Sequence, residues 1–232
     1  MTIPFWLVIP AAGVGARMAA DRPKQYLQIA GRSILEHSLH CFLDHPSLLG
    51  AMVCVAVDDP FWPQLPVAND PRVHRAPGGR ERADSVLAGL QMLLAEGAGA
   101  EDWVLVHDAA RPNLARQDLD RLLVSLADDP VGGLLAVPAR DTLKRASADG
   151  RVAQTVDRSV IWQAYTPQMF RLGALHQALS QALQAQVAVT DEASAMEWAG
   201  QSPRLIEGRA DNLKVTRPED LHYLQSLWPR GH

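Results

Sequence analysis

The length, composition and charge of the chain exclude several classes of protein. Its 232 residues fit one large domain, and 47% hydrophobic with 21% charged residues is the balance of an ordinary soluble globule. A formal net charge of −4 at pH 7 argues against a nucleic-acid-binding surface, which requires an excess of basic residues. We therefore expect no nucleic-acid partner, although a local basic pocket for phosphates stays compatible with these values.

The cysteines and the N-terminal segment bear on the cellular compartment. Cys41 falls in an expected helix and Cys54 in an expected strand, where free thiols usually pack as small hydrophobic groups. The apolar segment Ile3–Pro10 is too short for a signal peptide, and no basic segment precedes it. No apolar run reaches the length of a membrane span. We expect a cytoplasmic protein without a membrane partner.

Short apolar runs alternate with amphipathic patterns along the chain. The runs that predict buried strands are Phe5–Pro10, Ala51–Val57, Trp103–His107 and Leu134–Pro138. The patterns that predict helices are Ser33–Leu43, Asp84–Glu96, Asp118–Ala127 and Glu219–Leu227. Strands rich in Val, Ile and Leu are typical of a parallel sheet that is covered on both faces. The alternation therefore predicts an α/β sandwich with right-handed crossovers.

One polar region, Asp141–Asp157, interrupts this alternation. Within it, Asp149-Gly150 lies between two alternating runs, which is a strong signal for a β-hairpin. An isolated two-stranded hairpin is only marginally stable in water. We therefore favour an arm that packs on a second subunit over a hairpin that lies on its own domain.

The first candidate site is the segment directly after the first strand, Ala11–Met18. Gly13 and Gly15 allow backbone N–H groups to approach a polyphosphate closely. Arg17 and Lys24 supply cations, because Arg can bind two phosphate oxygens at once and Lys acts as a point charge. The pattern indicates a site for a nucleoside triphosphate.

Two other kinds of glycine loop fit this segment poorly. A dinucleotide-binding fingerprint requires a third glycine where Met18 stands, and an acid after a second strand, whereas Glu36 falls in a helix. A Walker A loop requires Gly-Lys-Ser/Thr, which is absent. A plain turn that leaves Arg17 and Lys24 as solvated charges stays open at this point.

The second candidate site, His107–Pro112, follows the third predicted strand. Ligands of open α/β sheets bind at the carboxyl ends of the strands. Asp108 is placed there to hold Mg²⁺, which prefers oxygen ligands and shares them with substrate phosphates, and Arg111 is placed to bind a phosphate. The alternative for Asp108 is a helix N-cap. We interpret His107 as a packing residue at the strand end rather than a catalytic base.

Three further segments carry weaker signals. Gly78–Ser85 places glycines before a helix and Ser85 in its first turn, although a plain glycine-rich turn has the same pattern. Thr190–Ser194 fits a helix N-cap with an acidic first turn equally well. In Asp211–Thr216, Lys214 lies just before a helix, within reach of an anion.

Taken together, the motifs resemble one family. Their order is A-A-G-x-G-x-R-M, P-K-Q-Y, G-G-x-x-R-x-x-S, H-D-A-A-R-P, D-T-x-K, T-D-E-A-S and D-N-x-K-V-T. This order resembles the 2-C-methyl-D-erythritol 4-phosphate cytidylyltransferases of the non-mevalonate isoprenoid pathway, from about Pro10 to Leu227. The resemblance implies a single Rossmann-like nucleotidyltransferase domain over residues 1–232, with a protruding β-hairpin arm inserted at about 139–160. It also implies a homodimer formed through the arm, and a divalent cation, usually Mg²⁺.

The resemblance also implies the residues of two substrate sites. CTP would be bound by Ala11, Ala12, Gly13, Gly15, Arg17, Lys24, Gly79, Ser85 and Asp108, with the metal on Asp108. Methylerythritol phosphate would be bound by Arg111, Thr142, Arg158, Thr166, Thr190 and Lys214. In the family, the arm residues that match Thr142 and Arg158 reach the site of the partner subunit.

The implied reaction is attack of the acceptor phosphate on the α-phosphorus of CTP. A phosphomonoester is mostly ionised at neutral pH, so it requires no general base, and catalysis consists of positioning and charge neutralisation. We expect Arg17 and Lys24 to stabilise the α-phosphate and the leaving diphosphate, and Arg158 and Lys214 to orient the incoming phosphate. The rivals are a nucleotidyltransferase for a sugar 1-phosphate or another alditol phosphate, a nicotinamide-dependent oxidoreductase, and a non-catalytic nucleotide sensor.

Overall fold

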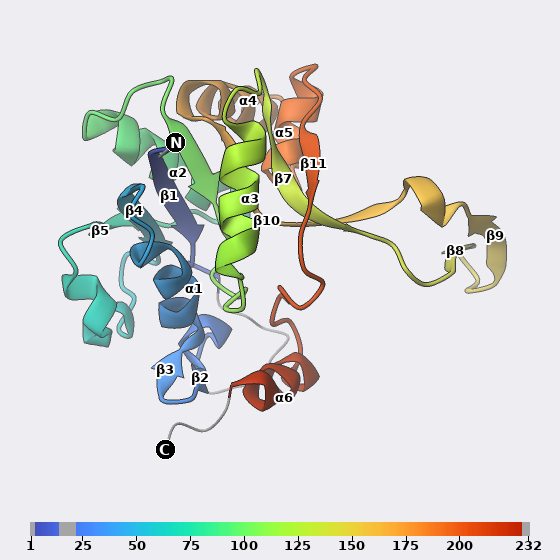
Figure 1. Cartoon of the computed structure of the whole chain (residues 1–232), viewed down its shortest axis with the longest axis horizontal. Coiled ribbons are helices and arrows are strands. Elements are labelled where there is room, and N and C mark those ends of the chain that lie inside the picture. Colours follow the sequence, from blue (N-terminus) through green and yellow to red (C-terminus); the bar gives the residue numbers. More distant parts are fainter. Residues whose placement is uncertain (1–2, 14–21, 229–232) are drawn as a thin grey trace.

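A seven-stranded sheet runs through the centre of the computed structural model, which describes residues 3–13 and 22–228 (Figure 1). Along the sheet the strands lie in the order β11, β7, β10, β6, β1, β4 and β5. Their bounds are β1 (Phe5–Pro10), β4 (Leu48–Val55), β5 (Val73–Pro77), β6 (Trp103–Val106), β7 (Gly132–Pro138), β10 (Trp162–Arg171) and β11 (Arg204–Glu207). Strand β10 runs antiparallel to its neighbours β6 and β7, and the other pairs are parallel. The predicted α/β fold with a mostly parallel sheet is confirmed.

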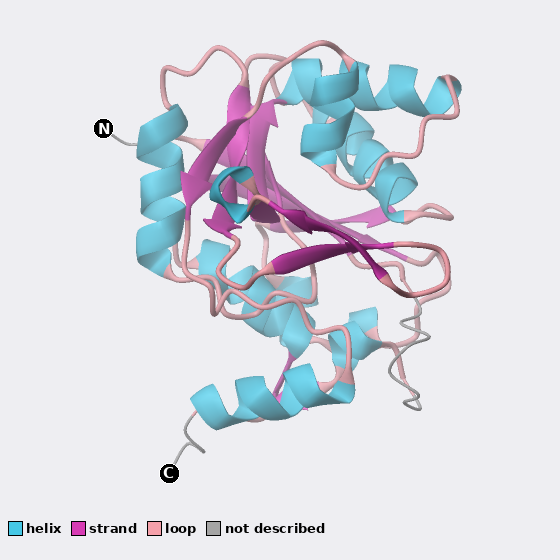
Figure 2. Ribbon diagram, turned by 90° about the vertical axis from the view of Figure 1, so that its right-hand side faces the viewer, coloured by secondary structure: helices cyan, strands magenta, loops and turns pink. Residues whose placement is uncertain are grey.

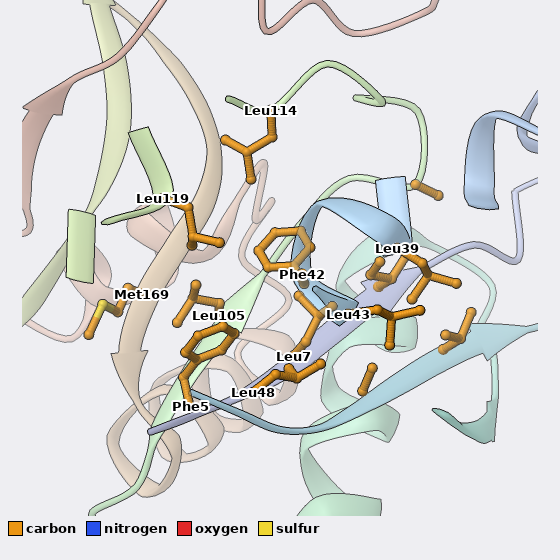
Figure 3. Close-up of a cluster of buried hydrophobic side chains, with 14 of the residues drawn as sticks. Phe5, Leu7, Leu39, Phe42, Leu43, Leu48, Leu105, Leu114, Leu119 and Met169 are labelled. Carbon is orange, nitrogen blue, oxygen red and sulfur yellow. The ribbon is translucent and has the colours of Figure 1, made fainter. Parts of the chain in front are cut away.

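Helices cover both faces of the sheet, as Figure 2 shows. Their bounds are α1 (Ile34–Leu43), α2 (Arg82–Ala95), α3 (Arg116–Leu126), α4 (Leu172–Gln184), α5 (Glu192–Trp198) and α6 (Pro218–Leu227). Helices α1 and α3 contribute Leu39, Phe42 and Leu119 to one buried cluster (Figure 3). Helices α2, α4 and α5 contribute to a second cluster, which contains Leu90 and Leu179. The molecule therefore has a helical layer on each side of one sheet.

Strand β1 illustrates why the sequence produces this arrangement. Phe5, Leu7 and Ile9 belong to the first cluster, and Val8 belongs to the second. Because neighbouring side chains of a strand point to opposite faces, a continuous apolar run is buried on both sides. Such a strand is stable only between two helical layers, and β1 accordingly lies inside the sheet, between β6 and β4.

The remaining elements were predicted with uneven success. All four predicted strands are present, and their ends differ from the prediction by at most three residues. All four predicted helices are present as well. Helices α2, α3 and α6 begin one or two residues earlier than predicted, and α1 begins directly after its predicted cap, Ser33. Ser33 caps α1 in the expected capping box with Glu36, and Asp191 caps α5.

Strands β5, β10 and β11 were not predicted, because their sequences are polar or short. Strand β10 even contains Pro167, and β10 shows a register shift between Ala164 and Gln168.

The predicted hairpin forms an arm that extends away from the sheet (Figure 1). Its strands are β8 (Leu143–Ala146) and β9 (Val152–Val156), which pair antiparallel. The turn between them contains Gly150 with a φ of +80°, a conformation that glycine adopts without strain. At its base, the arm continues the pairing of β7 with β10, since the Ala139 N–H donates to the Ile161 carbonyl at 2.9 Å.

Three smaller features surround the edge of the sheet where β1 and β6 end. A two-stranded ribbon, β2 (Gln28–Ile29) and β3 (Arg32–Ser33), precedes α1, and the 3₁₀ helix η2 (Lys24–Tyr26) precedes the ribbon. Helix α6 packs nearby through a third buried cluster that includes Ala110 and Val215. Among the described residues, no helix has the length and apolar character needed to cross a membrane.

Candidate functional site

The loop that leaves β1 is fixed by the chain that returns to it. The buried Gln25 side chain donates from Nε2 to the carbonyls of Ala11 at 2.7 Å and Gly13 at 3.1 Å. The Ala11 N–H donates to the Cys54 carbonyl at 2.8 Å. A Cβ atom at Gly78 would lie 2.1 Å from Ala12 Cβ, so only glycine permits this close approach of the next loop. The loop backbone is thus held from three sides.

Ser85 shapes the loop that approaches Ala12. Its hydroxyl accepts the Gly79 N–H at 2.9 Å and donates to the Glu81 carbonyl at 3.1 Å. Both contacts lie within the segment before and at the start of α2. The hydroxyl hydrogen is therefore committed to the loop, and a ligand beside Ser85 meets an oxygen that can only accept.

Asp108 stands at the carboxyl end of β6 among three cations. Its Oδ1 lies 2.9 Å from Arg82 Nε, and its Oδ2 lies 2.9 Å from Lys214 Nζ and 3.3 Å from Arg111 Nε. Burial opposes ionisation, but the charges of Arg82, Lys214 and Arg111 hold the pKa of Asp108 well below its usual range. The carboxylate is therefore charged throughout the neutral range.

Arg82 links Asp108 to a second buried carboxylate. Its Nη1 and Nη2 bind the two oxygens of Glu192 at 2.6 and 3.1 Å, and the Glu192 residue is 2% exposed. Burial disfavours the guanidinium charge, but Glu192 and Asp108 together raise the pKa of Arg82. Three cations face two carboxylates, so the cluster keeps one positive charge at the sheet edge.

Two cavities open on either side of this cluster. The first, of about 460 Å³, is lined by Pro10, Ala12, Gly13, Lys24, Gln25, Gly79, Arg80, Glu81, Arg82, Ser85, Asp108, Ala109, Ala110, Lys214 and Thr216. The second, of about 260 Å³, is lined by Arg82, Asp108, Arg111, Ala164, Tyr165, Thr166, Gln168, Thr190, Asp191 and Lys214. Arg82, Asp108 and Lys214 line both cavities. Two anionic groups, one in each cavity, would thus share the same cations.

Comparison with known proteins identifies the family to which this chain belongs. The family model for 2-C-methyl-D-erythritol 4-phosphate cytidylyltransferase matches residues 5–228. The chain belongs to this family. A relative of that name from Ectopseudomonas mendocina (strain ymp) is 79% identical over 228 residues, which cover 98% of this chain and 97% of the relative. A second, from Pseudomonas entomophila (strain L48), is 73% identical over 224 residues, which cover 97% and 95%.

Solved structures agree with the family assignment. A crystal structure of 4-diphosphocytidyl-2C-methyl-D-erythritol synthase matches with a TM-score of 0.84 and 41% identity, covering 98% of this chain and 99% of that one. The Francisella tularensis 2-C-methyl-D-erythritol 4-phosphate cytidylyltransferase matches with a TM-score of 0.83 and 34% identity, covering 97% and 100%. The fold of the described residues is therefore that of the cytidylyltransferase family.

Most of the residues predicted to bind the nucleotide lie around the first cavity. Those that line it are Ala12, Gly13, Lys24, Gly79, Ser85 and Asp108, and Lys214, which is predicted to bind the acceptor phosphate, lines it as well. Ala11 is buried beneath the loop, where its backbone groups bind Cys54 and Gln25. Gly15 and Arg17 lie outside the described residues. Lys24 Nζ donates to the Val215 carbonyl at 3.0 Å, which brings it to the segment that carries Lys214.

The second cavity brings together the acceptor-site residues Arg111, Thr166 and Thr190. Arg111 is buried. Its Nη1 donates to the Asn212 carbonyl at 2.7 Å, and its guanidinium lies 4.4 Å from the centre of the Tyr165 ring. Burial lowers the pKa of Arg111 against the opposing effect of Asp108. Arg111 therefore acts on the cavity from a fixed position in its wall.

Thr142 and Arg158 lie apart from the other predicted residues in the same chain. Both are exposed at the base of the arm, and neither lines one of the two cavities. Arg158 begins the 3₁₀ helix η5 (Arg158–Val160), and its Nη1 donates to the Arg140 carbonyl. Within a single chain, the structure does not unite these two residues with the rest of the acceptor site.

Sequence reasoning gave no role to Arg82, Glu192 or Gln25. Arg82 is the first residue of α2, where the positive end of the helix dipole disfavours a cation. An arginine at that position is a signal that carboxylates compensate it elsewhere. The partner, Glu192, lies 110 residues away in the chain, and no local spacing could reveal it.

Cys54 and His107 are buried, and Cys41 is half-buried. Burial raises the pKa of the Cys41 thiol to about 11 and that of the Cys54 thiol to about 12, so both stay protonated. Burial also lowers the pKa of His107 to about 4, so its ring is neutral. The expected burial is confirmed for Cys54, whereas Cys41 is half-buried. The edge contact of His107 with the Phe42 ring at 5.0 Å agrees with the expected packing of this residue.

Proposed function

We propose that the chain transfers a cytidylyl group from CTP to 2-C-methyl-D-erythritol 4-phosphate in isoprenoid precursor synthesis. An oxygen of the acceptor phosphate attacks the α-phosphorus of CTP, the bond to the β-phosphate breaks, and diphosphate leaves. The observation that carries this proposal is the wall of Arg82, Asp108 and Lys214 that the two cavities share. Membership of the cytidylyltransferase family supports the identity of both substrates.

We assign the first cavity to CTP. Its backbone side is the loop held by Gln25, and its cationic side contains Lys24 and Lys214. Lys24, together with Arg17, would neutralise charge on the α-phosphate and on the leaving diphosphate. Preorganised donors of this kind stabilise a transition state because they need not reorient during the reaction.

We assign the second cavity to the acceptor phosphate and its polyol. Arg111 is fixed in its wall, and Thr190 lies at its mouth, just before the cap of α5. The acceptor phosphate is a dianion at neutral pH, so no residue needs to remove a proton from it. The site has to overcome repulsion between two anionic substrates, and the excess positive charge of the shared cluster serves that purpose.

Asp108 is the carboxylate that lines both cavities, and we propose that it binds a divalent cation shared with the nucleotide. Among residues 3–13 and 22–228, no group of three or more His, Cys, Asp or Glu side chains could hold a metal ion alone. Magnesium commonly takes one or two carboxylates and completes its shell with phosphate oxygens and water. We propose that Asp108 supplies the protein ligand, and that bound magnesium would neutralise phosphate charge.

Lys214 is the most exposed of the three cations that contact Asp108. Its side chain is 37% exposed, whereas the Arg111 side chain is 9% exposed. Arg82 is additionally held by both oxygens of Glu192. Lys214 is therefore the cation best placed to bind the acceptor phosphate in the second cavity, which it also lines.

We further propose that two chains form a homodimer through the arm. The strands β8 and β9 are exposed along nearly their whole length, and Val152 is 66% exposed. A two-stranded hairpin gains stability by packing on another surface. A second subunit would bring Thr142 and Arg158 to a cavity that they do not line in their own chain. A cytoplasmic location stays a prediction.

Diphosphate release with CTP and Mg²⁺ tests the proposed reaction. Methylerythritol 4-phosphate should support release, and ribitol 5-phosphate and sugar 1-phosphates should support far less. Omission of the divalent cation should abolish release with every acceptor. Faster turnover with a sugar 1-phosphate or ribitol 5-phosphate would replace the proposed acceptor, and binding of CTP without diphosphate release would indicate a nucleotide sensor.

A further inference from the structure

His107 is completely buried next to the shared cluster, yet the proposed reaction gives it no role. It follows β6 directly and is 0% exposed, and it lines neither cavity. Its backbone N–H donates to the Val8 carbonyl at 3.0 Å. The Phe42 ring meets it edge-on, with an interplanar angle of 63°. Packing explains why a ring lies here, but it does not explain why the ring carries two nitrogens.

Both ring nitrogens have hydrogen-bond partners. Nε2 lies 2.9 Å from the Arg111 carbonyl, and Nδ1 lies 3.0 Å from Thr166 Oγ1. A carbonyl oxygen can only accept, so Nε2 carries the hydrogen, and Nδ1 of the neutral ring is an acceptor. The Thr166 hydroxyl must therefore donate to Nδ1. The same hydroxyl oxygen accepts the Asp108 N–H at 3.1 Å.

These contacts form one chain with a single direction. The Asp108 N–H donates to Thr166, Thr166 donates to His107, and His107 donates to the Arg111 carbonyl. The first and last groups are the two ends of one turn, because the Arg111 N–H also donates to the Asp108 carbonyl at 3.1 Å. The imidazole thus holds both ends of the turn that carries the Asp108 carboxylate.

We propose that His107 is a positioning residue that fixes the Asp108–Arg111 turn through Thr166, and thereby the cations that Asp108 holds. The proposal rests on the proposed cytidylyl transfer for its kinetic consequence. A shift of about 1 Å in a reacting group can cost about 10²-fold in rate, so a turn held at both ends has catalytic value. The strand β10 supplies Thr166 between Ala164 and Gln168, where the pairing of β10 with β7 shifts in register.

The chain of hydrogen bonds also restricts what Thr166 can do in the second cavity. Its hydrogen is committed to His107, so toward a ligand the oxygen can only accept. A fully ionised phosphate offers no hydrogen, whereas an alcohol does. Thr166 therefore suits a hydroxyl group of the acceptor polyol rather than its phosphate.

His45 provides a matched control for His107. It is also buried, its Nδ1 accepts the Ser47 N–H at 3.0 Å, and its Nε2 lies 3.1 Å from Asp120 Oδ1. Its ring meets Phe5 edge-on at 5.2 Å, as the His107 ring meets Phe42. His45 lies before β4, and it lines neither cavity. A loss that arises from packing alone should therefore appear equally in both histidines.

The test replaces each ring by phenylalanine and measures kcat, the KM for CTP and thermal stability. His107→Phe should lower kcat by about 10–100-fold, the usual effect of removing a group that orients a catalytic residue, with a smaller change in the KM for CTP. His45→Phe should lower the melting temperature and leave kcat unchanged. Thr166→Val should lower kcat to a similar extent, and Thr166→Ser, which keeps the hydroxyl, should restore it.

The double variant His107→Phe/Thr166→Val tests whether the two residues act as one unit. The kcat of the double variant should be no lower than that of the less active single variant, because one hydrogen-bond chain can be broken only once. Additive losses, or equal kcat losses in His45→Phe and His107→Phe, would overturn the proposal. Nitrogen NMR of the wild type should show the Nε2–H tautomer of His107, and the Nδ1–H tautomer would contradict it. An absence of diphosphate release by the wild type would contradict the proposed function itself. The NMR measurement needs no turnover, so it would still test the direction of the hydrogen bonds of His107 in that case.

Discussion

The sheet body and the β8–β9 arm are stabilised in different ways. Every residue of β6 is buried between two helical layers, whereas β8 and β9 are exposed along nearly their whole length. One of the few side-chain contacts across the arm is the 2.7 Å hydrogen bond from Lys144 to Thr155. The body therefore contains the interactions that fix its own site, whereas the arm makes few of its own, and we expect a second subunit to stabilise it. The difference predicts that body variants alter folding or chemistry within one chain, and that arm variants act through the second subunit.

The largest effect on folding should come from the buried ion cluster of the body. Glu192→Ala leaves the half-buried Arg82 with Asp108 as its remaining ion-pair partner, and the loss of the two charged hydrogen bonds should lower the free energy of unfolding by about 1–3 kcal/mol. Urea unfolding measures this loss, and Glu192→Gln should lose less because it keeps one acceptor oxygen. The matched variant on the arm is Arg151→Ala, which removes an exposed ion pair with Asp149, keeps the turn residues and should leave the unfolding curve unchanged. Equal losses in the two regions would contradict the comparison.

The next effect concerns chemistry in the body. Lys24→Ala should lower kcat by about 10²–10³-fold, the usual effect of losing a preorganised donor to a charged transition state, without unfolding the protein. Steady-state diphosphate release and a melting curve measure the two quantities. Lys24→Arg keeps the charge and should recover part of the rate. A rate like that of the wild type in Lys24→Ala would remove this residue from the proposed site.

The arm should show a similar loss of rate with a different origin. Arg158 is exposed, so Arg158→Ala should keep the stability of the wild type but lower kcat by about 10²-fold. When Lys24→Ala and Arg158→Ala chains are mixed into heterodimers, one of the two sites regains both residues. Activity should then rise well above that of either homodimer. Verified heterodimers without any rescue would show that the arm does not complete the partner's site.

The smallest expected effect is the pH dependence of the stability that Asp108 gives to the body. The pKa of Asp108 is depressed in the folded state, so its ionisation stabilises the fold above the ordinary carboxyl pKa of about 3.9 and is lost as pH falls further. Asp108→Asn should therefore be less stable than the wild type at pH 7, with a difference that shrinks in acid. Unfolding midpoints measured between pH 7 and acid give this trend, and a constant difference would contradict it.

The sequence predicted the parts of the fold that depend on local patterns. Strands β1 and β6 are continuous apolar runs, and Ser33 with Glu36 announces the start of α1. Strand β10 was missed because its stability comes from pairing with β6 and β7, not from its polar sequence. The hairpin was predicted because Asp149-Gly150 specifies a turn by itself.

The residues of the candidate site likewise divide into those that local sequence predicts and those that only tertiary packing brings together. Asp108 and Lys214 could be predicted because each stands beside a recognisable strand or helix. The bond from Arg82 to Glu192 joins two helices far apart in the sequence, and the bond between His107 and Thr166 joins residues that are 59 positions apart. These contacts follow from tertiary packing, which no spacing in the sequence encodes.

Isotope labelling of the acceptor phosphate tests the central claim most directly. With CTP, magnesium and acceptor whose phosphate oxygens are ¹⁸O, phosphorus NMR and mass spectrometry locate the label after one turnover. Attack by the acceptor phosphate on the α-phosphorus predicts that ¹⁸O bridges the two phosphorus atoms of the product, and that the released diphosphate is unlabelled. Label in the released diphosphate, or a bridging oxygen that is unlabelled, would contradict the account.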